Sequence, residues 1–145
     1  MLIQQISVFL ENTPGALRDL THVLGMGGID LMALSIADTQ NFGIVRLIVS
    51  SDKIDAALAL LRSSGYTARV NNVVCARVDD QPLGLCNLLE QVSRIGESVE
   101  YLYSFLRGTG EHAMMIFRMT HQETAAGKLI EQGAKLISQQ EIDRL

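Results

Sequence analysis

The sequence predicts an α+β protein built from two tandem βαββαβ modules. Each would have the ferredoxin-like arrangement of an antiparallel sheet with two helices on one face. One observation is a strand-like alternation of apolar side chains over residues 5–10, which returns 68 residues later over residues 73–78. Another is that the only two prolines, Pro14 and Pro82, follow these runs with the same separation. The chain is therefore predicted to be one module repeated, with residues 1–71 as the first copy and 72–145 as the second.

Apolar spacing predicts the other elements of the first copy. Leu17, Leu20 and Leu24 follow the i, i+3, i+7 spacing of one helix face, and Thr13 stands where a helix N-cap is expected. Further strands are expected at 31–38, 44–49 and 66–70, with a second helix at 52–64. The register between the copies shifts by a residue or two after the second strand, as a change of loop length would cause.

The second copy repeats this order. Its helix stripe is Leu85, Leu88 and Val92, its later strands are expected at 99–107, 114–119 and 134–138, and its second helix at 121–132. Ser138 and Glu141 have the spacing of a capping box for a last helical turn.

The second strand of the second copy is apolar on both faces. Tyr101, Tyr103 and Phe105 alternate with Leu102 and Leu106. This strand is an edge in the ferredoxin-like plan, and an apolar edge needs a cover. We expect the two second strands, 31–38 and 99–107, to pair and join the modules into an eight-stranded sheet. The tyrosine face would then pack on another surface, or a tyrosine would line a ligand pocket.

Composition limits the function classes. Hydrophobic residues make up 48% and charged residues 19%, which predicts an ordered chain with a real core. The net charge is −4 with scattered cations, so nucleic-acid binding is not expected. No apolar run is long enough to cross a bilayer and no signal peptide is visible, which predicts a cytoplasmic location. The two cysteines fit a reducing compartment.

No catalytic or metal-binding constellation is visible. The three histidines, His22, His112 and His121, have no Cys, Asp or Glu at metal-ligand spacing. Cys75 and Cys86 have no neighbouring base in the sequence that would activate a nucleophile. We therefore predict no cofactor, no metal and no enzymatic activity.

The loop after the first strand has the chemistry of a small binding site. With Pro14 as the first helical residue, Gly15 and Ala16 would carry backbone N–H groups with no helical acceptor, which suit a carboxylate. Gly15 has no Cβ, so a ligand could approach closely, and Asn12 can donate and accept at the entrance. The alternative is that these residues form only a capped turn that starts a helix.

The pattern Asn12-x-Pro14-Gly15-x-Leu17, followed by an apolar helix and Gly28-Ile29-Asp30-Leu31, resembles the ACT domain. This family adopts the βαββαβ fold and regulates amino-acid metabolism by binding amino acids. The resemblance covers essentially the whole chain as a tandem pair. It is more specific in the first copy, because the glycine of the second loop, Gly84, stands one place later than Gly15 does.

The resemblance implies a ligand held between two modules, touching the first loop of one and the second strand of the other. It points to Asn12, Pro14, Gly15, Ala16, Leu17, Asp30 and Leu31 in the first copy. The matching residues in the second copy are Asp80, Pro82, Leu83, Gly84, Leu85 and Ser98. Asp30 would accept from an α-ammonium group, or would be a solvated turn residue.

The expected function is that of an amino-acid-binding regulatory protein that assembles as a homodimer. The first loop should bind better than the second. The alternatives are a ligand-free interaction module and an unrecognised ferredoxin-like enzyme.

Overall fold

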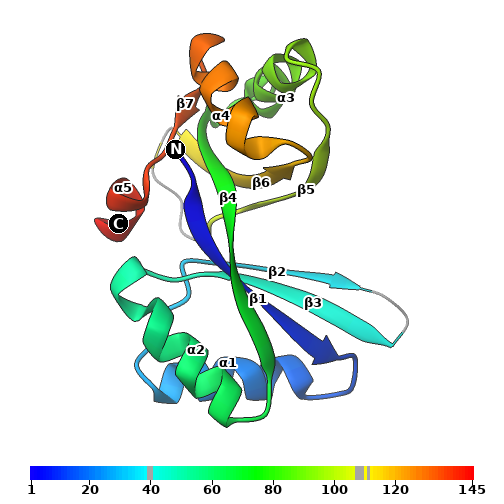
Figure 1. Cartoon of the computed structure of the whole chain (residues 1–145), viewed down its shortest axis with the longest axis vertical. Coiled ribbons are helices and arrows are strands. Elements are labelled where there is room, and N and C mark those ends of the chain that lie inside the picture. The colour runs from blue at the N-terminus through cyan, green and yellow to red at the C-terminus, as the bar shows by residue number, and fades with distance from the viewer. Residues whose placement is uncertain (39–40, 107–109, 111) are drawn as a thin grey trace. The chain divides into compact units, whose positions relative to one another are not determined.

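The order of elements in the first half of the chain follows the βαββαβ plan. The computed structural model describes residues 1–38, 41–106, 110 and 112–145. Residues Gln4–Asn71 form one compact unit, called here the first module. Its elements are β1 (Ile3–Glu11), α1 (Ala16–Met26), β2 (Ala33–Asp38), β3 (Phe42–Ile48), a 3-10 turn η1 (Ser51–Lys53), α2 (Ile54–Ser63) and the start of β4 (Thr67–Asp79). The helices α1 and α2 lie on one face of these strands (Figure 1).

The second compact unit, called here the second module, contains Asn72–Leu145 together with Met1–Ile3. It contains the end of β4, α3 (Gly84–Arg94), β5 (Val99–Ser104), β6 (His112–Met119), α4 (Gln122–Glu131), β7 (Lys135–Leu136) and α5 (Gln139–Asp143). Residue 107, the expected end of its second strand, lies outside the described residues. The two tandem modules of an α+β fold are therefore confirmed.

Each module has its own hydrophobic core beneath its helices. In the first module, Leu20 and Leu24 of α1 are fully buried in a cluster with strand residues such as Val8 and Val45. In the second, Leu88 and Val92 of α3 are buried in a separate cluster. The predicted helix stripes are thus the surfaces that cover the sheets, as expected from the burial of one apolar face.

The strand β4 belongs to both modules, which corrects the expected eight-stranded sheet. The strand order is β2-β3-β1-β4-β6-β5, with β7 also paired to β4, so the described residues contain seven strands. The segment 67–79 contains no glycine or proline that would end a strand, and it therefore continues where two separate strands were expected. Within their own modules, β2 pairs with β3 and β5 pairs with β6, and each of the two is the last strand in the order. Pairing of β2 with β5 stays a prediction.

The 68-residue offset holds at both ends of each module and changes in the middle. Arg46 lies opposite Ser7, while Ile116 lies opposite Cys75, so β6 stands 70 residues after β3. The offset returns to 68 at α2 and α4, because the first module has the additional turn η1 between β3 and its second helix. The predicted drift of register is confirmed, and residues after the second helix can be compared directly between the modules.

Two helix ends are closed by defined hydrogen bonds, and the second of them confirms a prediction from the sequence. Gly28, with φ 75°, follows α1 as a left-handed C-terminal residue, and Ile29 N–H donates to the Leu24 carbonyl. At α5, Glu141 N–H donates to Ser138 Oγ at 3.2 Å and Ser138 N–H donates to Glu141 Oε2 at 2.8 Å, which completes the capping box. The Ser138 N–H and the Ser138 hydroxyl, at 2.8 and 2.9 Å, both donate to Glu141 Oε2, and these two bonds lower the pKa of the Glu141 carboxyl.

Candidate functional site

The loop after β1 folds as a type II turn, which corrects the expected capping by Thr13. The Thr13 carbonyl accepts a hydrogen bond from Ala16 N–H at 3.1 Å, Pro14 is the second residue of the turn, and Gly15 is the third with φ 82° and ψ −6°. The helix α1 therefore begins at Ala16 with Gly15 as its N-cap and without a side-chain cap. The left-handed backbone at Gly15 explains why this position holds glycine.

This turn changes which backbone N–H groups face outward. The Ala16 N–H was expected to have no partner, but the turn uses it. The first internal bond of α1 runs from Asp19 N–H to the Gly15 carbonyl, so helix geometry leaves the N–H groups of Leu17 and Arg18 without an acceptor inside the helix. The positive end of the helix dipole is therefore at this loop, although one residue later than expected.

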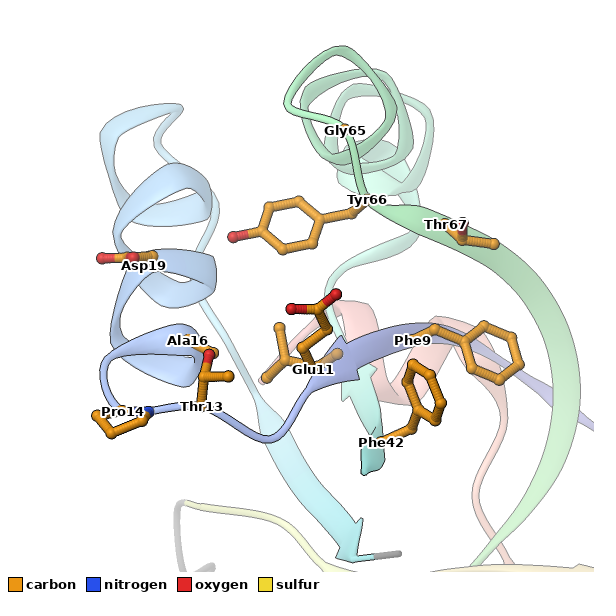
Figure 2. A pocket seen from close by; sticks show the side chains of 11 residues that line it. Phe9, Glu11, Thr13, Pro14, Ala16, Asp19, Phe42, Gly65, Tyr66 and Thr67 are labelled. Atoms are coloured by element: carbon orange, nitrogen blue, oxygen red, sulfur yellow. The ribbon is translucent and has the colours of Figure 1, made fainter. Parts of the chain in front are cut away.

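A cavity of about 400 Å³ lies beside the turn and is formed within the first module. Its walls come from the end of β1, the turn and start of α1, the start of β3, and the connection from α2 to β4 (Figure 2). The lining residues are Phe9, Leu10, Glu11, Thr13, Pro14, Ala16, Asp19, Phe42, Gly65, Tyr66 and Thr67. These segments meet because β4 is the neighbour of β1 in the sheet.

The polar end of this cavity is acidic. Glu11 and Asp19 contribute carboxylates, and no lysine, arginine or histidine lines the cavity. The Tyr66 hydroxyl points toward α1, and the Glu11 carboxylate points toward the Tyr66 ring (Figure 2). Asp19 has one partner, Arg18, whose Nη1 lies 3.2 Å from Asp19 Oδ1 on the exposed surface. This end is suited to a positively charged group that donates hydrogen bonds.

The other end of the cavity is aromatic. Phe9 of β1 and Phe42 of β3 are diagonal neighbours on paired strands, because Glu11 is opposite Phe42 and Phe9 is opposite Ile44. Phe9 is 45% exposed and Phe42 is 56% exposed, so both rings present apolar surface to solvent. The guanidinium carbon of Arg69 lies 5.9 Å from the centre of the Phe9 ring.

The structure brings together only part of the predicted first-copy site. Pro14 and Ala16 line the cavity, whereas Asn12, Gly15 and Leu17 are not among its lining residues. Leu17 and Leu31 pack against the core instead. Asp30 follows the C-terminal end of α1, so the 11 residues of this helix, about 16 Å, separate it from the turn within the module.

Sequence reasoning missed the residues that give the cavity its chemistry, namely Phe9, Glu11, Asp19, Phe42 and Tyr66. One signal was available for Tyr66. In the βαββαβ plan the last strand runs antiparallel to the first, so the residues that begin the last strand lie beside the end of the first. Asp19 and Phe42 carried no comparable signal, because a charged helix residue and an exposed strand residue are common on any surface.

The second loop has a different turn. The Gln81 carbonyl accepts from Gly84 N–H at 2.9 Å, and Leu83 has φ −103° and ψ 5°, which is a type I turn with Pro82 as its second residue. A Cβ on Gly84 would stand 1.8 Å from the Asp79 carbonyl oxygen, so the displaced glycine is required where the loop backbone approaches α3.

The other second-copy candidates lie apart from one another. Leu83 is 64% exposed at the N-cap of α3, and Leu85 packs against the core of the second module. Asp80 lines a separate polar cavity with His112, and Ser98 is exposed just before β5. Only Gly84 lines the cavity that corresponds to the one in the first module, and this second cavity has about 140 Å³.

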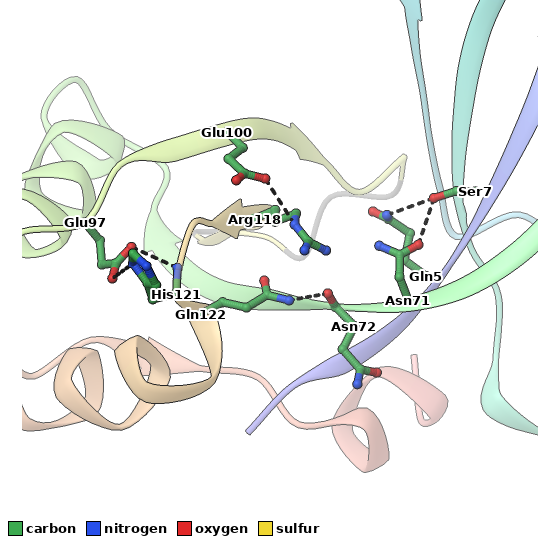
Figure 3. A network of polar contacts seen from close by, with 9 residues as sticks. All are labelled: Gln5, Ser7, Asn71, Asn72, Glu97, Glu100, Arg118, His121 and Gln122. Atoms are coloured by element: carbon green, nitrogen blue, oxygen red, sulfur yellow. Dashed lines mark hydrogen bonds and ion pairs between the residues drawn. The ribbon is translucent and has the colours of Figure 1, made fainter.

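Another polar cavity of the second module lies at the start of α4, and its two basic residues, Arg118 and His121, each lie beside a glutamate. Arg118 Nε donates to Glu100 Oε2 at 3.1 Å, and His121 Nδ1 lies 3.3 Å from Glu97 Oε1 (Figure 3). Glu97 also accepts from the His121 N–H at 3.2 Å. Gln122 Nε2 donates to the Asn72 carbonyl in the same region (Figure 3). The basic groups of this cluster are therefore already used in contacts within the module.

Two further features concern the side chains that could act as nucleophiles or bind a metal ion. Burial raises the pKa of Cys75 to about 12, so its thiol stays protonated at neutral pH. Within the described part of the chain, no group of three or more His, Cys, Asp or Glu side chains is arranged to hold a metal ion. Among the same residues, no helix is long and apolar enough to cross a membrane.

Comparison with proteins of known structure shows how widely this architecture occurs. The chain is similar to protein BT0572 from Bacteroides thetaiotaomicron, with 31% identity, a TM-score of 0.88, and coverage of 100% of this chain and 98% of that one. It also shares the fold of the regulatory subunit of aspartate kinase from Thermus thermophilus, crystallised in a ligand-free form. There the identity is 19%, the TM-score 0.64, and the coverage 90% and 93% of the two chains.

The family comparison covers the full length. No curated protein matches the sequence closely enough to show a relationship. A family model described as the ACT domain pair matches residues 1–145, and both this description and the two modules agree with the motif in the first loop. The chain is therefore a member of the ACT domain pair family, which is a regulatory family.

Proposed function

We propose that this protein is a regulatory sensor that binds a free amino acid in the cavity of the first module. The observation that carries the proposal is the composition of the cavity wall, in which Glu11, Asp19 and Tyr66 contribute and no lysine, arginine or histidine is among the described lining residues, although Arg18 pairs with Asp19 on the exposed surface. A volume of about 400 Å³ lies within the range of small-molecule sites. The regulatory subunit of aspartate kinase, which shares the fold, supports a role in regulation.

The proposed pose uses each end of the cavity for one part of an amino acid. The α-ammonium group donates to Glu11 and to the Tyr66 hydroxyl oxygen. The α-carboxylate lies toward the turn and the start of α1, where Pro14 and Ala16 line the cavity and the positive end of the helix dipole favours a negative charge. The ligand side chain then extends toward Phe9 and Phe42, where apolar contact adds affinity. Asp30 has no part in this pose, because α1 separates it from the turn.

Calorimetric titration with the twenty amino acids tests the proposal. For a ligand that binds, Glu11→Gln should weaken affinity by about 10- to 100-fold, the value of a charge-assisted hydrogen bond. Tyr66→Phe should weaken it by about 2- to 10-fold, the value of a neutral one. Glu131→Gln is the matched control, since it removes the same charge from an exposed position in α4 that lines no described cavity.

Two results would contradict this assignment. If no amino acid binds the parent protein, the sensor function is wrong. If an amino acid binds and both the Glu11 and Tyr66 variants retain the parental affinity, the ligand lies elsewhere and the first-module cavity is not its site.

We also propose that the protein acts as a homodimer. Large apolar side chains are exposed in the single chain, including Met26 at 77%, Ile36 at 46% and Leu106 at 61%. Self-association would cover part of this surface. Multi-angle light scattering at high micromolar concentration should give twice the chain mass, and the mass of a single chain under those conditions would count against the proposal.

A further inference from the structure

The cavity of the second module occupies the same place in its module as the proposed amino-acid site does in the first, but its charge is reversed. The 68-residue offset relates Phe9 to Arg77 and Thr67 to Lys135, and these four residues line their respective cavities. The first cavity has no cation in its wall, and the second has two.

The residues of the second module at the positions of Asp19 and Tyr66 lack the acidic and aromatic groups of the first cavity. Asp19 corresponds to Asn87, which loses a negative charge, and Tyr66 corresponds to Ala134, which loses the ring and hydroxyl. Glu11 corresponds to Asp79, which keeps a carboxylate. The Asp79 carboxylate lines this cavity too, but its two partners, His112 and Gln81, do not. Its Oδ1 lies 3.4 Å from His112 Nδ1, and its Oδ2 accepts from Gln81 at 3.5 Å.

The two cations stand side by side on paired strands. Arg77 of β4 is directly opposite Lys135 of β7 in the antiparallel register. Like charges in this position destabilise a strand pair, because the side chains of opposite residues lie on the same face about 5 Å apart at Cβ. Glu141 is near enough to Arg77 for the two charges to interact.

We propose that the cavity between β4, α3 and the start of β7 is a site for a compact anion of the phosphate type. Arg77 and Lys135 supply the positive charge and Asn87 supplies an amide donor. The volume of about 140 Å³ admits a phosphate-sized group and not the larger ligand expected in the first module. The two modules thus hold equivalent cavities with opposite ligand preferences, so one chain senses two different molecules.

An NMR titration of the full chain with potassium phosphate tests this site, with potassium chloride at equal ionic strength as the reference. Phosphate should shift the backbone amide signals of Gly84, Asn87 and Lys135 in a saturable way, and chloride should not. Lys135→Gln should weaken the phosphate response by about 10-fold or more, as expected for loss of a charged hydrogen bond. Lys128→Gln removes the same charge from an exposed position on α4 and should leave the response unchanged.

A second titration, with phosphoserine, tests whether the site requires free phosphate. Phosphoserine carries the same group on a larger body, and saturable shifts at the same three residues would identify phosphorylated small molecules as ligands alongside free phosphate. Phosphate shifts that do not exceed those of chloride, or an equal loss in the Lys128 and Lys135 variants, would overturn the proposal. The proposed amino-acid site in the first module is tested with different variants and different ligands. The outcome of that test is therefore independent of the phosphate result.

Discussion

Replacement of Gly84 by alanine should destabilise the protein far more than replacement of other glycines. A Cβ at this position would stand 1.8 Å from the Asp79 carbonyl oxygen and 2.9 Å from its carbonyl carbon, whereas real Cβ contacts essentially never fall below 3.0 Å. The carbonyl would have to withdraw by about 1.2 Å, which would also disturb its hydrogen bond from Gln81 N–H at 2.9 Å.

The magnitude follows from two opposing effects. Alanine is favoured over glycine in a helix by about 1 kcal/mol. Steric overlap in a packed region costs about 1–3 kcal/mol, and more where backbone must move. We therefore expect Gly84→Ala to lower the free energy of unfolding by about 2 kcal/mol. Gly127→Ala in α4 is the matched control, because a Cβ there meets nothing within 4 Å, and it should raise stability by up to about 1 kcal/mol.

Gly15 offers a contrast within the same experiment. Its surroundings are open, since a Cβ would meet nothing within 4 Å, but its φ of 82° is costly for any L-residue. Left-handed strain of about 1–2 kcal/mol, partly offset by the lower entropy of the unfolded chain, predicts a loss of about 1 kcal/mol for Gly15→Ala. Urea unfolding followed by circular dichroism measures all three variants. If the Gly84 variant were as stable as the Gly127 variant, the close approach of the second loop to α3 would be refuted.

Two further predictions concern the C-terminal helix and the thiols. Ser138→Ala should lower stability at neutral pH by about 1 kcal/mol through loss of the cap of α5, as measured by chemical unfolding. Because the Ser138 hydrogen bonds hold the folded-state pKa of Glu141 below the ordinary value of 4.5, the advantage of the parent over this variant should be present above that pH and shrink as the pH falls through the folded pKa. With a thiol-specific colorimetric reagent, Cys86 should react in the native protein while Cys75, with a pKa of about 12, reacts only after denaturation. Two fast-reacting thiols in the native state would show that Cys75 is not protected.

The fold could be predicted because it depends on patterns that repeat. The alternation in β1 and β4 and the stripe at Leu20 and Leu24 report which faces are buried, and burial is the dominant determinant of these elements. The turn at Gly15 was harder. Its sequence allows both a side-chain cap and a type II turn, and the choice depends on the path of the chain into α1.

The candidate site could be predicted only in part, because a cavity depends on which segments the sheet brings together. Pro14 and Ala16 belong to the loop that the motif indicated, and both line the cavity. Glu11 and Tyr66 are separated along the chain and meet only because β4 lies next to β1. Asp30 was grouped with the loop through the family resemblance, and the length of α1 separates the two in the module.

The shared strand β4 also constrains how such a chain can change over time. Its even-numbered residues contribute to the core of each module, with Ala68 in the first and Val74, Ala76 and Val78 in the second. Side chains alternate along a strand with a period of two, so one residue inserted between Val74 and Val78 would turn the inward positions after it outward while their partners on β6 stay in place. Within this half of β4, only insertions or deletions of an even number of residues keep the inward positions aligned with the core of the second module. The strand therefore rejects single-residue changes in length at positions where it can still accept a substitution.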